Sequence, residues 1–447
     1  MEDDKDIFKK YTEQVAETEL TEVEPPKGLR QRPQPSKASL RKKRKRRIIG
    51  LIALAVIALI VVVSVILGGK NTVSTDKDFK ISASGSTATI VMFTGKAEIV
   101  NIPEKLEGCT VVAIGKGAFM NCKRITEVTI PVTVKLIGEN AFENCIKLTK
   151  LTLPNNSIVI SAGAFAGCTG LNNLSIPYSI KSVGYDAFAK TPWLDTQSKD
   201  FVVVGNNLLI KYKGSAASVT VPKTVTKIGD GAFSHNTKLT KVVIPNGVAT
   251  ISDSAFFGCT ALKNVSIPNS VYVIGKWAFG KCTALTAINL PKSLTIMKSY
   301  AFYGCTGLKT ITIPRGLIRI DDYSFENCTA LKTAHIPNGV TNIGRFSFYG
   351  CTKLGNIVIP STMTNIGYCS FSNCTGLLKA QLQAGVKLID VSAFSGCVNL
   401  KTITVPKSVK GIGTDAFKNC KKLIISCPEN SYAEKYANKF GLTYGLS

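Results

Sequence analysis

Residues 239–261 read LTKVVIPNGVATISDSAFFGCTA, and the next block, residues 262–284, reads LKNVSIPNSVYVIGKWAFGKCTA. Both blocks place a leucine, an Ile-Pro pair, an Ala-Phe pair and a cysteine at the same positions. A single unit of this length is too short to bury its own apolar positions. A pattern that returns at a fixed period therefore predicts units that stack and cover one another.

The phenylalanine of the Ala-Phe or Ser-Phe pair marks this period along the chain. Every interval is 23 residues except the one from Phe188 to Phe233, which is 45 and equals one repeat plus 22 extra residues. This spacing gives thirteen repeats, whose phenylalanines are Phe119, Phe142, Phe165, Phe188, Phe233, Phe256, Phe279, Phe302, Phe325, Phe348, Phe371, Phe394 and Phe417.

Each repeat also carries local signals for its elements. The alternation around Val242 and Ile244 predicts a short strand, which Pro245 ends because proline has no N–H to donate. The segment SAFFGC, residues 254–259, predicts one tight helical turn with Phe256 directed inward. We therefore predict an α+β repeat solenoid of 23-residue units.

The motifs of the repeat also carry a family resemblance. The Leu-x-x-Val-x-Ile-Pro opening, the Ile-Gly-x-x-Ala-Phe middle and the Asn/Gly-Cys-Thr close resemble the BspA-like class of leucine-rich repeats, over about residues 79–440. The resemblance implies a leucine-rich-repeat array with the form of a curved right-handed solenoid, on a surface protein that binds other molecules. It does not imply an enzyme.

Residues 48–67 form an apolar run of 20 residues without a charge, which is long enough to cross a bilayer as a helix. A buried soluble helix and a cleaved signal peptide are the alternatives, but 47 residues precede the run and no small-x-small cleavage pattern follows it. We expect an uncleaved single-pass transmembrane helix. The run RKKRKRR, residues 41–47, then places the N-terminus in the cytoplasm and the repeats outside the cell membrane.

The segments on either side of this helix have little capacity to form a core. Residues 1–47 carry nine acids, fourteen bases and several prolines, and we expect a disordered cytoplasmic tail. The basic run alone would also fit a nucleic-acid patch. Its position directly before the apolar run favours a topology signal that contacts lipid headgroups, so no nucleic-acid partner is expected. Residues 68–78 are assigned as a linker.

The net charge of the chain indicates what kind of partner it can attract. The whole chain carries a net charge of +26, of which residues 1–47 account for +5, so the remaining residues carry +21. Such an excess of positive charge favours anionic partners, such as glycans and wall polymers. The alternative is a solvated, lysine-rich surface that only keeps the protein soluble.

Eleven of the fourteen cysteines share one repeat position, three residues after the phenylalanine. Asn236 takes this position in one repeat, an exchange that a disulfide or a zinc site would not tolerate. We therefore predict free, buried thiols in one column. The cysteines outside the column, and the only candidates for reactive thiols, are Cys109, Cys369 and Cys427.

No catalytic motif stands out. The chain has only two histidines, His235 and His335, and it lacks a Gly-rich phosphate loop, a Gly-x-Ser-x-Gly elbow and a His-Glu-x-x-His helix. We assign no catalytic residue, no metal and no cofactor, and we expect a protein that is not an enzyme.

The extra residues and the two ends of the array have their own patterns. Apolar runs on either side of Gly205-Asn206-Asn207 predict a hairpin insertion at residues 191–218, acting either as a contact loop or as a splice between two sub-arrays. The terminal units need covers. Residues 79–102 are expected to form an N-terminal cap of strands, and residues 431–441 a C-terminal helical cap that ends the solenoid near residue 440.

The candidate binding residues lie two and four positions before the proline, where side chains of the strand point outward. Stacking brings equal positions side by side, so these columns form a lattice of hydroxyls and amides with scattered lysines. Thr and Ser could also be present only for strand propensity and solubility. The candidates are Thr129, Lys150, Thr152, Lys241, Val243, Ser266, Asn289, Thr312, His335, Lys379 and Thr404.

These observations favour a membrane-anchored extracellular protein for adhesion or ligand binding, which recognises a protein or an anionic glycan or wall polymer through its strand face. The alternative is a non-catalytic structural scaffold of the cell surface. An enzyme built on the hairpin is a third and weaker hypothesis.

The topology can be tested by adding protease to intact cells. We expect digestion of the repeats and protection of residues 1–47, because the positive-inside rule keeps the basic run in the cytoplasm. An intact repeat region after digestion, with degradation only after the cells are opened, would contradict this topology.

Overall fold

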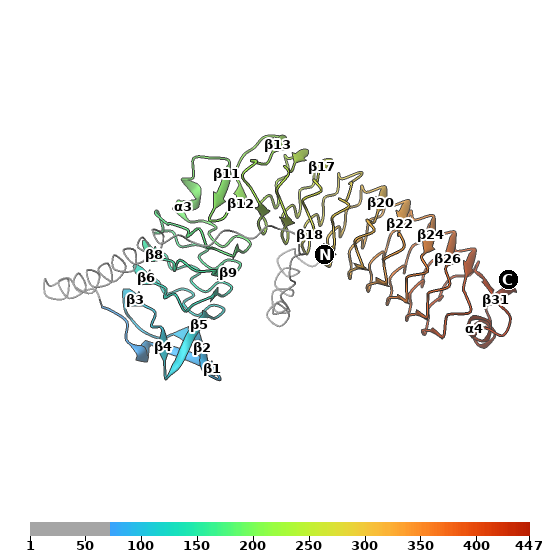
Figure 1. The fold of residues 1–447 in the computed structure, drawn as a ribbon, viewed down its shortest axis with the longest axis horizontal. Helices are drawn as coiled ribbons and strands as arrows, with labels where there is room; N and C mark the ends of the chain where they lie inside the picture. The colour runs from blue at the N-terminus through green and yellow to red at the C-terminus, as the bar shows by residue number, and fades with distance from the viewer. Residues whose placement is uncertain (1–71) are drawn as a thin grey trace, which may run out of the picture. The chain divides into compact units, whose positions relative to one another are not determined.

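The computed structural model describes residues 72–447 (Figure 1). The predicted tail at 1–47, the predicted membrane helix at 48–67 and residues 68–71 of the linker lie outside the described residues. Among residues 72–447, no helix is both long and apolar enough to cross a membrane.

Most repeats contribute two short strands, and equal strands of successive repeats pair in parallel. The strand before the proline belongs to what we call the first ladder. The first ladder consists of three sheets, with the strands β3 (Ile99–Asn101), β6 (Glu127–Thr129) and β8 (Lys150–Thr152); β13 (Ser218–Thr220), β15 (Lys241–Val243) and β17 (Asn264–Ser266); and β20 (Thr310–Thr312), β22 (Thr333–His335), β24 (Asn356–Ile359), β26 (Lys379–Leu382), β28 (Thr402–Thr404), β30 (Ile424–Cys427) and β31 (Thr443–Leu446).

The second ladder is formed by the strands that follow the proline turn, together with the strands that begin each part of the array. These strands are β1 (Phe79–Ser84), β2 (Thr87–Phe93), β4 (Lys105–Leu106), β5 (Cys109–Ile114), β7 (Leu136–Ile137), β9 (Val159–Ile160) and β10 (Ser182–Val183); β11 (Phe201–Val204), β12 (Leu208–Tyr212), β14 (Lys227–Ile228), β16 (Thr250–Ile251), β18 (Val273–Ile274) and β19 (Ile296–Met297); and β21 (Arg319–Ile320), β23 (Asn342–Ile343), β25 (Asn365–Ile366), β27 (Leu388–Ile389) and β29 (Gly411–Ile412).

The third side of each repeat is a chain of turns, which we call the turn stack, and not the predicted helical turn. Within residues 254–259, the N–H of Phe257 donates to the carbonyl of Ser254 at 3.0 Å, inside the same repeat. The N–H of Phe256 instead donates to the carbonyl of Ala278 in the next repeat, at 2.7 Å. A helix would use these N–H groups internally. The turn stack directs alternate N–H groups to carbonyls of the next repeat, so the hydrogen bonds on this side also hold successive repeats together.

The predicted solenoid of repeats of about 23 residues is confirmed, but the α+β class overstates its helix content. Within the described residues, helix is limited to the 3-10 helix η2 (Asp76–Asp78) and the α-helices α3 (Pro192–Asp195) and α4 (Tyr432–Phe440). The reason is the turn stack, which replaces a helix in each repeat.

The core is a column of stacked phenylalanine rings. Phe256 is fully buried and lies between Phe233, with ring centroids 4.8 Å apart, and Phe279, at 5.2 Å. The ring planes differ by only 13° and 2°, respectively. Each ring therefore covers the face of the next, which a single repeat could not achieve alone.

The hairpin of β11 and β12 divides this core into two clusters. The two strands pair antiparallel. β12 packs against both sub-arrays: Leu208 and Ile210 lie in the N-terminal cluster, whereas Leu209 and, beyond a register shift of the hairpin, Tyr212 lie in the C-terminal one. The insertion thus acts as a splice that covers the open ends of both sub-arrays.

Aromatic residues close the phenylalanine column at its interruptions and ends. Trp193 of α3 meets Phe188 edge to face at 5.0 Å, and Tyr212 of β12 lies 5.2 Å from Phe233. At the start of the array, Phe93 of β2 stacks on Phe119 at 5.1 Å.

Helix α4 covers the C-terminal end of the column, as expected. Its N-cap Ser431 accepts a hydrogen bond from the N–H of Glu434 at 3.2 Å, and Tyr436 meets Phe417 edge to face at 6.0 Å. The array does not end near residue 440, however, because β31 adds a further parallel strand beside β30.

We expect Phe256→Ala to lower the free energy of unfolding by about 3–5 kcal/mol, because the substitution opens a cavity between two rings. Hydrogen exchange should show the largest loss of protection in the repeats on either side of residue 256, since contacts in a solenoid are with nearest neighbours. The exposed control Thr260→Ala should change stability by no more than about 0.5 kcal/mol. Equal effects of the two substitutions would contradict the role of the ring column.

Candidate binding surface on the strand face

The outward side of the first ladder, which we call the strand face, arises from the alternation of side chains along each strand. In β24, Asn356 and Val358 are exposed while Ile357 and Ile359 are buried. Parallel pairing without slippage then sets Asn356 beside Lys379 of β26. Equal repeat positions therefore form columns, with neighbouring strands about 4.8 Å apart.

The predicted residues lie on this face but not on one continuous sheet. The repeat after β8 and the one after β17 lack a strand in the first ladder, because β8 and β17 are the last strands of their sheets. Asn289 is exposed in such a gap, outside any strand. The other predicted residues divide among the sheets as Thr129, Lys150 and Thr152; Lys241, Val243 and Ser266; and Thr312, His335, Lys379 and Thr404.

The lysines of the strand face differ in their surroundings. Lys150 donates to the Glu127 carboxylate of the adjacent strand at 2.6 Å, so its charge is largely compensated. Within the described residues, Lys241 and Lys379 are exposed and pair with no carboxylate. These two lysines are the groups best placed to meet an anionic ligand. The sequence pattern did not distinguish them from Lys150.

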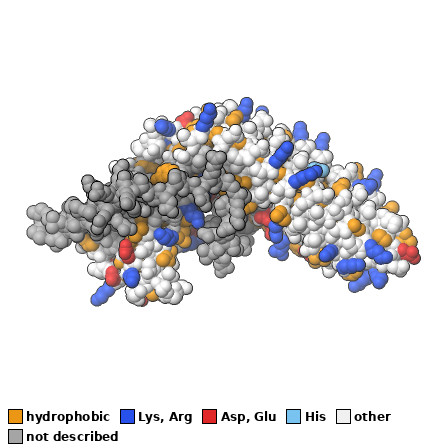
Figure 2. Space-filling view, in the orientation of Figure 1, with side chains coloured by type: hydrophobic (Ala, Val, Ile, Leu, Met, Phe, Trp, Pro, Cys, Tyr) orange, Lys and Arg blue, Asp and Glu red, His pale blue; other side chains and the backbone are white. Residues whose placement is uncertain are grey.

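The charge on the molecular surface is uneven in sign. Figure 2 shows one face of the molecule, on which blue lysine and arginine side chains outnumber red aspartate and glutamate side chains. Because these cations are spread over many repeats, the electrostatic attraction for an anion extends along the ladder and is not confined to a single point.

The cysteines are free, as expected, and the column has a uniform geometry. Cys259 donates its thiol to the carbonyl of Phe233, one repeat earlier, at 3.1 Å, and Cys282 does the same to Phe256 at 3.2 Å. Ten of the eleven column cysteines make this bond, at 3.1–3.2 Å. Each thiol thus links two repeats. At the same position, Asn236 accepts from the N–H of Leu239 at 3.0 Å.

Two of the three cysteines outside the column are poor candidates for reactive thiols. Cys369 and Cys427 are buried, and burial raises the pKa of both thiols. A raised pKa disfavours the thiolate, which is the nucleophilic form. Cys109 is half-buried.

Among residues 72–447, no three or more His, Cys, Asp and Glu side chains are arranged to hold a metal ion.

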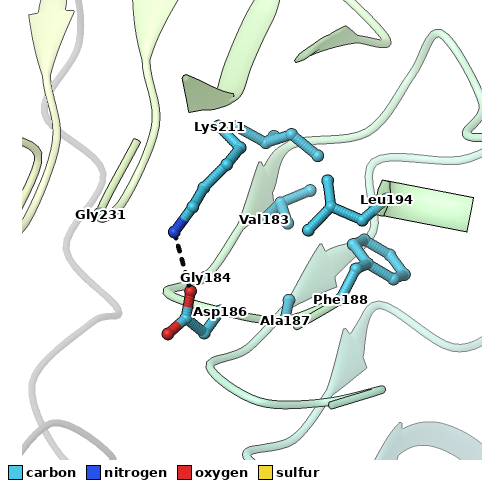
Figure 3. A pocket seen from close by; sticks show the side chains of 9 residues that line it. Val183, Gly184, Asp186, Ala187, Phe188, Leu194, Lys211 and Gly231 are labelled. Carbon is cyan, nitrogen blue, oxygen red and sulfur yellow. Dashed lines mark hydrogen bonds and ion pairs between the residues drawn. The ribbon is translucent and has the colours of Figure 1, made fainter. Parts of the chain in front are cut away.

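Figure 3 shows a small pocket where the hairpin meets the repeat before it, a feature that the sequence pattern did not indicate. Within it, Lys211 donates to Asp186 at 3.2 Å, so its two charged groups neutralise each other and leave no free charge for a ligand. Its lining residues are Val183, Gly184, Asp186, Ala187, Phe188, Leu194, Ile210, Lys211 and Gly231.

Parallel strands from successive repeats, a buried phenylalanine column and an exposed polar strand face are together typical of a leucine-rich-repeat protein. Residues 92–201, 204–328 and 295–424 match the model of the BspA type leucine rich repeat region, in six copies. The chain therefore belongs to the family of proteins with BspA-type leucine-rich repeats, as the sequence motifs indicated. Proteins with such repeats generally take part in protein binding or surface interactions, and they are typically non-enzymatic scaffolds.

Solved structures of leucine-rich repeat proteins are similar to this chain. One from Bacteroides ovatus is 26% identical, with a TM-score of 0.39, and the match covers 83% of this chain and 98% of that one. A leucine rich cell surface protein from Faecalibacterium prausnitzii is 27% identical, with a TM-score of 0.37, and the match covers 81% and 96%. No curated protein matches the sequence.

The buried thiols should make the protein sensitive to alkaline pH. Burial raises the pKa of Cys259, Cys305 and Cys374 to about 12, whereas an unfolded chain releases these protons near its ordinary pKa of about 8.5. The contribution of these protonated thiols to the free energy of unfolding is fully present below about pH 8.5. It is lost as pH rises toward 12, because only the unfolded state releases thiol protons in this range. At about pH 10, we expect each thiol to lower the free energy of unfolding by about 1–2 kcal/mol.

Urea unfolding at a series of pH values measures this loss. Lysines and tyrosines also titrate above pH 9, so the control is a variant with all three cysteines changed to alanine. Its stability should fall less steeply with pH. Rapid alkylation of these thiols in the native protein at pH 8 would show that they are accessible and would contradict the interpretation.

Proposed function

We propose that this protein is a membrane-anchored extracellular binding or adhesion protein, which recognises a macromolecular ligand through the strand face. The repeats would stand outside the cell on the predicted helix at 48–67, with the N-terminus in the cytoplasm. This localisation rests on the order of the basic run and the apolar run in the sequence.

The observation that carries the proposal is the set of exposed side chains held in register on parallel strands. Thr310, Thr333 and Asn356 occupy one column on adjacent strands, and Lys379 and Thr402 continue it. Such a surface offers hydrogen-bonding groups at regular spacing over many repeats. It suits an extended ligand better than a small molecule.

The charge of the ligand is inferred from the two uncompensated lysines. Lys241 and Lys379 are exposed on two different sheets of the first ladder, and the exported part of the chain carries an excess of positive charge. An anionic glycan or wall polymer would gain from both, and an acidic protein surface is the other partner that fits. A non-catalytic scaffold would not need a ligand at these positions, so direct binding separates the two functions.

Binding to immobilised heparin and teichoic acid, used as anionic probes, tests this proposal. Raising the salt from about 0.1 M to about 1 M shortens the screening length from about 10 Å to about 3 Å, so the affinity should fall steeply. The double variant Lys241→Glu and Lys379→Glu should bind about tenfold more weakly, since each lost surface contact is worth up to about 1 kcal/mol. The thermal midpoint should not change.

The matched control reverses two exposed lysines beside the second ladder, Lys387→Glu and Lys410→Glu, which changes the net charge by the same amount. This control should bind almost as well as the original protein. Equal loss in both double variants would show that only the total charge matters, and binding that is insensitive to salt would rule out an anionic ligand on the strand face.

A further inference from the structure

Exposed lysines follow one edge of the C-terminal sheet of the first ladder, where its strands begin. This sheet runs without a gap from β20 to β31. Each of its first six strands has at least one lysine at its first residue or within the three residues before it. One such lysine from each strand forms what we call the lysine row: Lys309, Lys332, Lys353, Lys379, Lys401 and Lys422, all exposed.

Backbone hydrogen bonds between the repeats hold this row in register. The N–H of Lys332 donates to the carbonyl of Lys309 at 2.8 Å, and the N–H of Gly355 donates to that of Lys332 at 3.1 Å. The N–H of Lys401 donates in the same way to the carbonyl of Leu378 at 2.9 Å. Because neighbouring strands lie about 4.8 Å apart, the row supplies one cation for about every 4.8 Å of the solenoid axis.

The charges of the row have no carboxylate partner. Among residues 72–447, none of the six lysines forms an ion pair with Asp or Glu. Lys422 donates to the neutral amide oxygen of Asn399 at 2.7 Å, which leaves its charge in place. The acids of residues 308–427 all follow the second-ladder strand of their repeat, away from the row in the sequence; they are Asp321, Asp322, Glu326, Asp390 and Asp415.

The row begins and ends with the sheet. Residues 282–289, CTALTAIN, precede β20 and carry no charge, and residues 440–447 beyond the last lysine carry none either. The N-terminal sheet of the first ladder differs, because Glu127 pairs there with Lys150 at 2.6 Å. The uncompensated row therefore has a defined length of six strands.

Neutral hydrogen-bonding groups accompany the lysines. Thr310, Thr333 and Thr402 each directly follow a lysine of the row, and Asn356 lies in the same column on β24. Thr310 and Thr333 are exposed, as is Asn356. Most strands of this edge thus repeat one unit, which consists of a cation and a neutral polar group beside it.

We propose that the lysine row binds a linear polyuronate, a polysaccharide that carries one carboxylate on every sugar ring. This inference rests on the proposed strand-face function and names the class of its ligand. A uronic acid residue in an extended chain is about as long as the separation of two strands. Successive carboxylates therefore meet successive lysines, and the ring hydroxyls lie near the threonines.

Other anionic polymers match this spacing less well. The phosphates of one DNA strand recur about every 3.4 Å along the helix axis. An extended acidic peptide directs every second side chain to one side, so its carboxylates are about 7 Å apart. Hyaluronan carries a carboxylate only on every second sugar. Since a single exposed ion pair contributes little, the affinity depends on how many pairs form at once, and spacing decides that number.

The experiment titrates the full-length protein at low salt with oligogalacturonates of increasing length, by calorimetry. We expect the affinity to rise steeply with each added sugar until there is one for each of the six strands, and to level off beyond that length. The methyl-esterified oligomers have the same chain without the charge and should not bind.

A pair of matched variants tests whether the row is the binding site. Lys332→Gln with Lys353→Gln removes two neighbouring charges from the row and should weaken binding about tenfold, as expected for the loss of two exposed ion pairs. Lys387→Gln with Lys410→Gln removes two exposed charges beside neighbouring strands of the second ladder and should leave the affinity nearly unchanged. The basic run at 41–47 is the same in both variants, so it cannot cause a difference between them.

Three outcomes would overturn the polyuronate assignment. They are equal weakening in both double variants, an affinity that keeps rising at the same rate beyond six sugars, and tighter binding of polyglutamate or hyaluronan than of oligogalacturonate. If heparin and teichoic acid still bind in a manner that depends on Lys241 and Lys379, the proposed strand-face function stands without a polyuronate ligand. If no anionic polymer binds, both proposals fail.

Discussion

The face-to-face contact between the core phenylalanine rings of neighbouring repeats is the interaction on which the rest of the structure depends. The rings stack at about the spacing of adjacent parallel strands, so ring contact and strand pairing reinforce one another. The column thiols add a bond from each repeat to the phenylalanine carbonyl of the repeat before it. A repeat that slipped by one residue would lose all three contacts, and this cost holds the array in register.

Strict register turns single outward residues into columns. A side chain at one position lies beside its equivalents from the repeats before and after it. Side chains of one chemical type can therefore form an extended surface along the solenoid axis, and no pocket is needed. The strand face does this with hydroxyls, amides and lysines. These outward residues can change by substitution without disturbing the core column.

The 23-residue period is interrupted once, between Phe188 and Phe233, and here a hairpin replaces the regular stacking of repeats. The hairpin of β11 and β12 presents one set of side chains to each sub-array, and Trp193 and Tyr212 cover the two open ends of the ring column. Two core clusters result, each with its own nearest-neighbour contacts. In a solenoid, stability is approximately a sum over such neighbours, so each part is stabilised mainly by contacts among its own repeats.

The sequence by itself determined the period, the inward and outward positions and the single column of cysteines, because these depend on the order of apolar and polar residues within one repeat. It also indicated the hairpin, but not that the hairpin packs against both sub-arrays. It did not determine that residues 254–259 form turns and not a helix, since that depends on the N–H of Phe256 finding a carbonyl in the next repeat. Nor could it show that Glu127 compensates Lys150 while Lys241 pairs with no carboxylate among residues 72–447, or that rings 23 residues apart stack from Trp277 to Phe346. These features are contacts between repeats, and their geometry exists only once the repeats lie against one another.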